Sequence, residues 1–156
     1  MADEKEPEFR LITTNRKARF RYEILETVEA GLVLTGTEVK SLRRGKCNLK
    51  EGYAAVERDE VWLIGVHIPE YTEAHQFNHD PIRRRKLLLS RRQIKHFAAE
   101  TQQKGLTLVP LRLYFKGKTA KVEIGLGRGK KLYDKRQTIM KRETERQMRR
   151  EQSHRR

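Results

Sequence analysis

The chain has 156 residues, enough for one hydrophobic core but too few for two ordinary domains with a linker. Lys and Arg number 36 against 21 Asp and Glu, and the net charge of +15 favours nucleic acid as the partner over an anionic membrane surface. No apolar run approaches the ~18 residues of a membrane span, the acidic start lacks the pattern of a signal peptide, and the single Cys47 excludes an internal disulfide. We therefore expect a cytoplasmic protein that has no membrane partner.

The first third of the chain predicts a strand followed by a short helix. Residues 19–26 alternate apolar with charged side chains, which is the period-two pattern of a half-buried strand. Thr35 and Glu38 stand at the spacing of a capping box and predict a helix that ends at Gly45.

The middle of the chain predicts a hairpin and a long loop. Two β-rich segments, 49–57 and 61–68, flank a charged turn, and Trp62 lies in the second segment. Residues 69–84 exceed the ~12–15 residues of most structureless connections, so we expect a functional or mobile loop.

The following segment predicts a second helix and two final strands. Ser90 and Gln93 form another capping box, and apolar residues recur at helical spacing until Gly105. The alternation that follows changes phase at Pro110, which predicts a bulge or an edge position. About six short strands with flanking short helices favour a mainly β fold with α, an OB-like closed antiparallel β-barrel. An open α+β sandwich is the alternative.

The C-terminal segment carries more than half of the net charge. Residues 127–156 contribute +8 and hold too few apolar side chains for a fold of their own. We therefore expect a flexible N-terminal arm at 1–14, an RNA-binding barrel at 15–130 and a basic tail at 131–156. The tail should be disordered when free and helical once phosphates neutralise its mutually repelling arginines.

Clustered cations and aromatic rings are the candidate binding groups. Cations interleave with Phe20 and Tyr22, a pattern that suits structured RNA, although the pattern favours the alternative that both rings belong to the core and the arginines form a solvated outer face. Further cations cluster around the first helix and at 83–86, and each cluster is either a phosphate site or an ordinary solvated face. Glu38 among them either caps its helix or accepts hydrogen bonds from a base edge.

The sequence carries no pattern that predicts catalysis or metal binding. His75 and His79 stand four residues apart but lack the further ligands of a zinc site. The glycines between 125 and 129 do not have the spacing of a nucleotide-binding loop. We therefore expect no cofactor, no metal and no catalytic residue.

Four ordered segments of the chain carry a resemblance to a known family. They read GLVLTGTEVKSLRRGKCNLKEGYA (31–54), RRKLLLSRRQI (84–94), GLTLVPLRLYF (105–115) and KVEIGLGRGKKLYDKR (121–136). They are similar to SmpB, the family of bacterial SsrA-binding proteins that accompany transfer-messenger RNA, and the likeness runs from Asn15 to Arg136.

The resemblance implies an OB-like barrel without catalytic activity that binds the tRNA-like domain of transfer-messenger RNA in trans-translation. The family's RNA contacts fall on Asn15, Lys17, Tyr22, Gly36, Glu38, Lys40, Arg43 and, as a weaker match, Lys86. The family's tail probes the decoding centre and the empty messenger channel, where the matching residues are Gly129, Tyr133, Asp134, Lys135 and Arg136. Some members carry His in place of Tyr133, and a tyrosine cannot supply the positive charge of a protonated histidine.

The main alternative is a ribosomal or RNA-chaperone barrel that coats RNA without selecting one molecule. Both hypotheses describe a basic, monomeric RNA-binding protein. Selective binding of one RNA would distinguish the first from the second.

Overall fold

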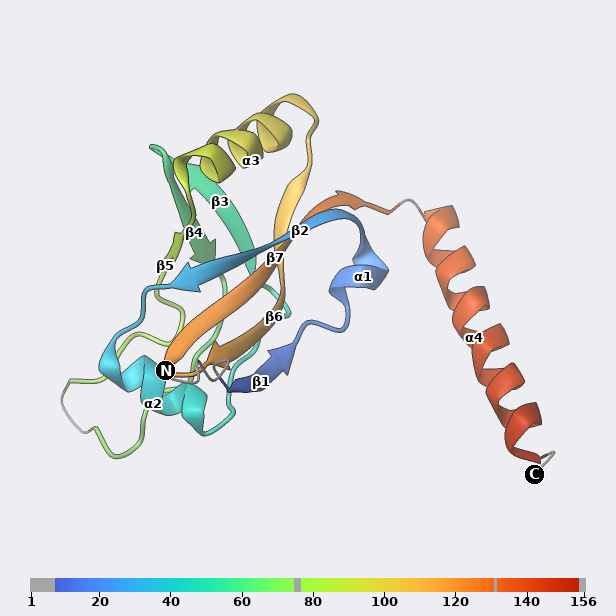
Figure 1. The fold of residues 1–156 in the computed structure, drawn as a ribbon, viewed down its shortest axis with the longest axis horizontal. Coiled ribbons are helices and arrows are strands. Elements are labelled where there is room, and N and C mark those ends of the chain that lie inside the picture. Colours follow the sequence, from blue (N-terminus) through green and yellow to red (C-terminus); the bar gives the residue numbers. More distant parts are fainter. Residues whose placement is uncertain (1–7, 75–76, 131, 155–156) are drawn as a thin grey trace, which may run out of the picture.

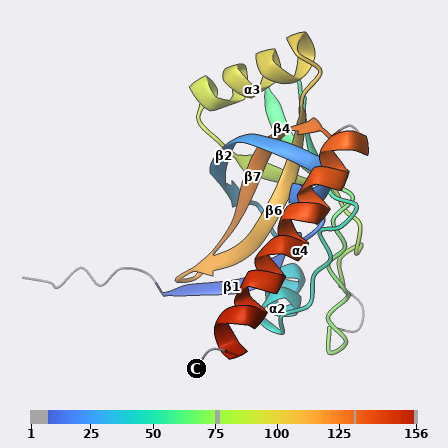
Figure 2. The same cartoon turned by 90° about the vertical axis from the view of Figure 1, so that its right-hand side faces the viewer.

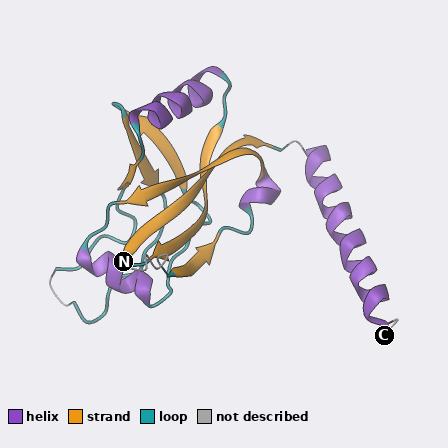
Figure 3. Cartoon of the chain, viewed as in Figure 1, coloured by secondary structure: helices purple, strands orange, loops and turns teal. Residues whose placement is uncertain are grey.

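The computed structural model describes residues 8–74, 77–130 and 132–154, and in these ranges it has seven strands and four helices (Figures 1 and 3). The strands are β1 (Phe9–Thr14), β2 (Tyr22–Leu32), β3 (Tyr53–Glu57), β4 (Glu60–Ile64), β5 (Arg85–Leu88), β6 (Thr107–Lys116) and β7 (Thr119–Gly129). The helices are α1 (Ala18–Arg21), α2 (Gly36–Arg43), α3 (Arg91–Gln103) and α4 (Leu132–His154). The fold is therefore mainly β with several helices, as the sequence predicts.

Antiparallel pairing arranges six of the strands in a ring. The strands follow the order β1-β6-β3-β4-β5-β2-β7, and β6 additionally pairs with β7. The other edge of β6 serves two neighbours, because Leu108 pairs with Ala54 of β3 while residues 112–116 pair with β1. The ring thus contains β2 to β7, and β1 lies outside it.

The ring surrounds the main hydrophobic core. Leu42 of α2 and Phe97 of α3 are buried in this core, and the two helices lie at opposite ends of the sheet in Figure 1. A second, smaller cluster contains Ala18 of α1 together with Val109 and Leu111 of β6. The second cluster fixes the short helix α1 against the outer side of β6.

Several local predictions are confirmed. Both capping boxes form, at the starts of α2 and α3. The predicted hairpin forms between β3 and β4, with Trp62 in the second strand. The register between β6 and β7 shifts between Pro110 and Arg112, where the sequence pattern changes phase.

Two predictions near the N-terminus are wrong. Residues 9–14 are not part of a flexible arm, because they form β1 and pair with β6, while residues 1–7 lie outside the described ranges. The sequence hides this strand because Phe9 and Leu11 remain about half exposed, so pairing rather than burial holds it. Residues 18–21 form α1 instead of extending a strand, since burial of Ala18 turns the chain between β1 and β2.

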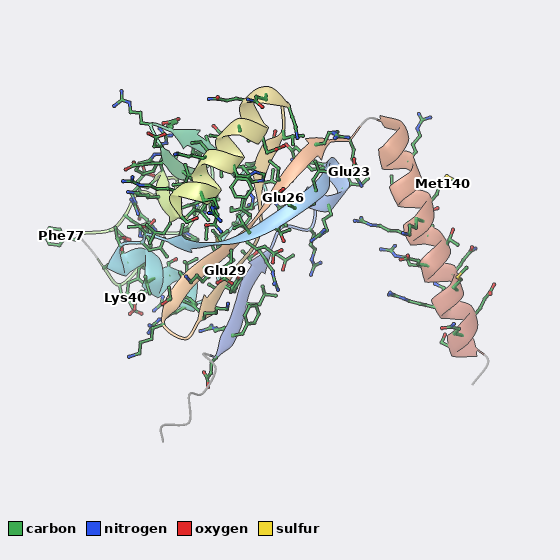
Figure 4. The ribbon with its side chains drawn as sticks, turned by 45° about the horizontal axis from the view of Figure 1, so that its top comes forward. Glu23, Glu26, Glu29, Lys40, Phe77 and Met140 are labelled. Carbon is green, nitrogen blue, oxygen red and sulfur yellow. The ribbon has the colours of Figure 1, made fainter. Side chains whose placement is uncertain are left out.

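Residues 132–154 form α4, which follows the ring near α1 (Figure 1), and in the turned view this helix lies in front of the strands (Figure 2). The sequence predicts a disordered free tail, whereas the structure has a helix there. The high helix propensity of the Lys, Arg, Gln and Glu residues in this segment accounts for the helix. The side chains described at 136 and 139–153 are exposed, among them Met140 (Figure 4). None of the described helices is long and apolar enough to cross a membrane.

Candidate nucleic-acid interface

Asn15 organises the corner between β1 and α1. Its backbone N–H donates to the carbonyl oxygen of Leu111 at 2.7 Å. Its side-chain Nδ2 donates to the carbonyl oxygens of Pro110 at 3.0 Å and Leu49 at 3.4 Å. These hydrogen bonds connect the corner both to β6 and to the loop before β3. Asn15 therefore fixes the position of the neighbouring residues at the surface.

Lys17 and Tyr22 lie on either side of α1. Lys17 is exposed, and contact with the amine of Lys50 lowers the pKa of Lys17. The ring of Tyr22 packs half-buried against the second cluster, and Gly127 makes room for it, since an added Cβ would lie 2.9 Å from the Cβ of Tyr22. The corner thus places cations beside the ring of Tyr22, which packing holds in position. This combination suits the binding of a phosphate next to an unstacked base.

Helix α2 presents a second group of predicted contacts. Lys40 and Arg43 are exposed on this helix, and Figure 4 shows Lys40 at its outer side. The ammonium of Lys40 lies 5.7 Å from the ring centre of Tyr71, and the guanidinium of Arg44 lies 4.5 Å from it. Gly36 begins the helix in open space, where an added Cβ would meet no atom within 4 Å. This surface therefore offers cations around an aromatic ring.

Glu38 is fully buried and forms the capping box of α2, so the capping role is confirmed, and its carboxylate is not exposed to a base edge in this structure. Its Oε1 accepts from the backbone N–H of Thr35 at 2.9 Å and from Arg83 at 2.5 Å, and its Oε2 accepts from Arg85. Burial alone would raise the pKa of Glu38, but these three donors hold the pKa below its ordinary value. Glu38 therefore joins α2 to the start of β5.

The basic run 83–86 does not provide the free phosphate site that the sequence allows. Along β5 the side chain of Arg85 shares the inward face with Leu87, and it is as fully buried as Glu38. The side chain of Lys86, a predicted RNA contact, lies on the other face of β5 and pairs with Glu60. The ion pairs of the run are Arg83 and Arg85 with Glu38, Arg84 with Glu57 at 2.8 Å, and Lys86 with Glu60 at 3.1 Å.

His79 holds the long loop against α2. Its Nδ1 lies 2.9 Å from the hydroxyl of Thr37, and its Nε2 lies 2.9 Å from the carbonyl oxygen of Ile68. The carbonyl can only accept, so Nε2–H donates to it and Nδ1 accepts from the hydroxyl. Within the described ranges, which omit His75, no three side chains form a metal-binding group. His79 is therefore a structural histidine.

The outer side of β2 carries glutamates that neighbouring basic side chains contact, so it offers few free cations to a polyanion. Figure 4 shows three glutamates along this strand. Each has a basic neighbour: Glu23 with Arg128 at 3.9 Å, Glu26 with His96 at 2.7 Å, and Glu29 with Lys116 at 3.0 Å. The candidate interface therefore consists of the corner at α1 and the exposed side of α2.

The predicted ribosome contacts begin where β7 ends. Gly129 is the last residue of β7 and pairs with Tyr22, so the two predicted groups of contacts meet at this point. Arg136 is exposed on α4. Tyr133, Asp134 and Lys135 belong to the first part of α4, and their side chains lie outside the description.

Sequence reasoning missed Lys50 and Tyr53 and misplaced Arg85. Lys50 and Tyr53 line the same pocket as Asn15 and Tyr22, but single residues in a turn and at a strand start carry no periodic pattern. Arg85 stands two residues before Leu87, and this period-two spacing was the signal that places it on the buried face.

The chain is similar to known proteins over most of its length. The model of the family described as SmpB protein matches residues 12–154. An SsrA-binding protein of Gloeothece citriformis is 60% identical over 142 residues, which cover 90% of this chain and 92% of that protein. One from Ligilactobacillus salivarius is 55% identical over 144 residues, covering 92% and 93%.

A solved structure described as "tmRNA-SmpB: a journey to the center of the bacterial ribosome" superposes with a TM-score of 0.65. It is 49% identical, and the superposition covers 77% of this chain and 85% of that one. The family match spans both candidate surfaces, the ring and all of α4. On this basis, the chain belongs to the SmpB family.

Proposed function

We propose that this protein binds the tRNA-like domain of transfer-messenger RNA and delivers it to stalled ribosomes in trans-translation. The names of its relatives and of the related solved structure support this function. The observation that carries it is the pair of exposed cationic surfaces, each with an aromatic ring, on a chain whose charge is +15. SmpB is an RNA-binding family and not an enzyme family, so catalysis is not assigned.

Structured RNA fits these surfaces better than duplex DNA. Lys17, Lys40 and Arg43 supply charge for phosphates, and the partly exposed rings of Tyr22 and Tyr71 offer surfaces to bases that are not stacked in a helix. Folded RNA exposes such bases in loops, whereas duplex DNA keeps them stacked. Glu38 supports this binding by fixing α2, and Asn15 supports it by fixing the corner at α1.

We propose that the ring of six strands is an OB-like closed barrel and that the protein acts as a monomer in the cytoplasm. The continuous antiparallel pairing around the ring supports the barrel. OB folds bind oligonucleotides with cations and aromatic rings, and the corner at α1 offers both, since Lys17 and Tyr22 flank this helix.

We further propose that α4 contacts small-subunit ribosomal RNA at the decoding centre and in the empty messenger channel. Its 23 residues span about 34 Å at 1.5 Å per residue, and its described side chains are exposed. Gly129, Tyr133, Asp134, Lys135 and Arg136 are the proposed contacts. Since the described side chains of α4, at 136 and 139–153, are exposed, phosphates that neutralise its arginines should stabilise it on the ribosome.

Competition binding tests the RNA specificity. The purified chain should retain labelled tRNA-like RNA against an excess of bulk tRNA at ~200 mM salt, where nonspecific phosphate contacts weaken steeply. Replacing Lys40 and Arg43 with Gln should weaken this binding, whereas the matched change of Lys118, an exposed lysine in the β6–β7 turn, should have little effect. Equal binding to both RNAs would favour the general RNA-chaperone function.

A further inference from the structure

A small pocket opens at the corner between α1 and the loop before β3. Its volume is about 190 Å³. Clefts that hold a whole drug-sized ligand are larger, at roughly 300–1,000 Å³, so this pocket has room for one part of a larger molecule. Its walls include the side chains of Asn15, Arg21, Tyr22, Lys50 and Tyr53.

The pocket is built before any ligand arrives. The amide of Asn15 bonds to the carbonyl oxygens of Leu49 and Pro110, which adjoin the lining residues Lys50 and Val109 in the chain. Gly52 allows the walls to approach, because an added Cβ would lie 2.7 Å from Val66 and 3.1 Å from the carbonyl of Leu49. This bracing lowers the ordering cost of binding.

Two tyrosines of different exposure line the pocket. Tyr22 is half-buried against the second cluster, and Gly127 leaves the space that its ring occupies. Tyr53 is 45% exposed at the start of β3. An aromatic ring held beside an open pocket is the arrangement on which proteins stack single bases, whatever their identity.

Cations outnumber acids around the pocket, because Arg21 and Lys50 line it together with one acid, Glu51. The amine of Lys50 lowers the pKa of Lys17 by direct contact and by repulsion, Arg21 adds to this repulsion, and only Glu51 opposes it. None of the ion pairs found within the described ranges involves these three cations. Two adjacent amines repel one another in the free protein, and an anion placed between them would remove that repulsion.

We propose that this pocket binds one unstacked nucleotide of the RNA, with its base against Tyr22 and Tyr53 and its phosphate between Lys17 and Lys50. The inference rests on the proposed RNA-binding function and adds Lys50 and Tyr53 to its contacts. The volume of the pocket suits a base without the rest of the RNA, and the lining residues Arg21 and Lys50 supply positive charge for its phosphate.

Affinity for the tRNA-like RNA tests the stacking contact. Tyr53→Ala should weaken binding about 5- to 100-fold, the range found for single base-stacking rings, while Tyr53→Phe should retain most of the affinity. Phe9→Ala is the matched control, because Phe9 is 51% exposed and does not line the pocket. Lys50→Gln should reduce the salt dependence of binding by about one phosphate contact, whereas Lys118→Gln should not.

An RNA with single abasic positions identifies the bound nucleotide. One abasic position should weaken binding to the unchanged protein and have little further effect in Tyr53→Ala, because both changes remove the same contact. Selective RNA binding that Tyr53→Ala and Lys50→Gln leave unchanged would overturn the pocket but leave the proposed function standing. Failure of the unchanged protein to select the RNA would overturn both.

Discussion

Replacing Glu38 with alanine should lower the free energy of unfolding by about 3–5 kcal/mol, the range for removing one partner of a buried ion pair. Both Glu38 and Arg85 are fully buried. Without the carboxylate, Arg85 keeps hydrogen bonds to the carbonyl oxygens of Val66 at 2.6 Å and Pro81 at 3.0 Å but loses its counter-charge. The capping contact to the N–H of Thr35 is lost as well.

Thermal and urea unfolding, followed by circular dichroism and the fluorescence of Trp62, measure this loss. A change of 1 kcal/mol moves Tm by roughly 2–4 °C in a chain of this length, so Glu38→Ala should lower Tm by about 6–20 °C. Glu73→Ala is the control, because Glu73 pairs with Arg44 at 2.6 Å on the surface and should cost about 1 kcal/mol or less. A loss for Glu38→Ala no larger than that of the control would refute the buried-pair reasoning.

A double variant separates positioning from direct RNA contact. Glu38→Leu with Arg85→Met replaces the buried pair by apolar side chains, an exchange that is often neutral for stability. If Glu38 acts by holding α2, RNA affinity should fall in Glu38→Ala and recover largely in the double variant. Recovered stability with RNA binding still lost would show that the carboxylate itself contacts the RNA.

Three further outcomes are expected. Contacts in the folded chain hold the pKa of the Glu38 carboxyl below 4.5, so the ionised carboxylate stabilises the fold fully above pH 4.5 and this stabilisation is lost as the pH falls through the folded-state pKa. The difference in Tm between the unchanged protein and Glu38→Gln should therefore shrink as the pH falls from about 6 to about 3. A constant difference would contradict this. Burial raises the pKa of Cys47 to about 12, so a thiol reagent at about pH 8 should react much more slowly with the folded than with the unfolded chain. Deleting residues 134–156 should spare binding of the isolated RNA and abolish tagging on stalled ribosomes, and a large loss of RNA binding would show that α4 takes part in it.

Local sequence patterns determined a large part of this fold. The capping boxes of α2 and α3 involve residues three apart, so their spacing is readable without knowing any tertiary contact. The hairpin around Trp62 and the phase change at Pro110 follow from period-two alternation within one or two strands. The excess of positive charge and the resemblance to SmpB likewise depend on composition and order alone.

The candidate site, in contrast, depends on contacts between residues far apart in the chain. Glu38 meets Arg85 only because α2 packs beside the start of β5, and Lys17 meets Lys50 only because Asn15 ties α1 to the loop before β3. β1 likewise owes its existence to pairing with β6. Which charges are buried and paired and which remain free for phosphate was decided by this long-range packing, since desolvation and ion pairing depend on three-dimensional neighbours.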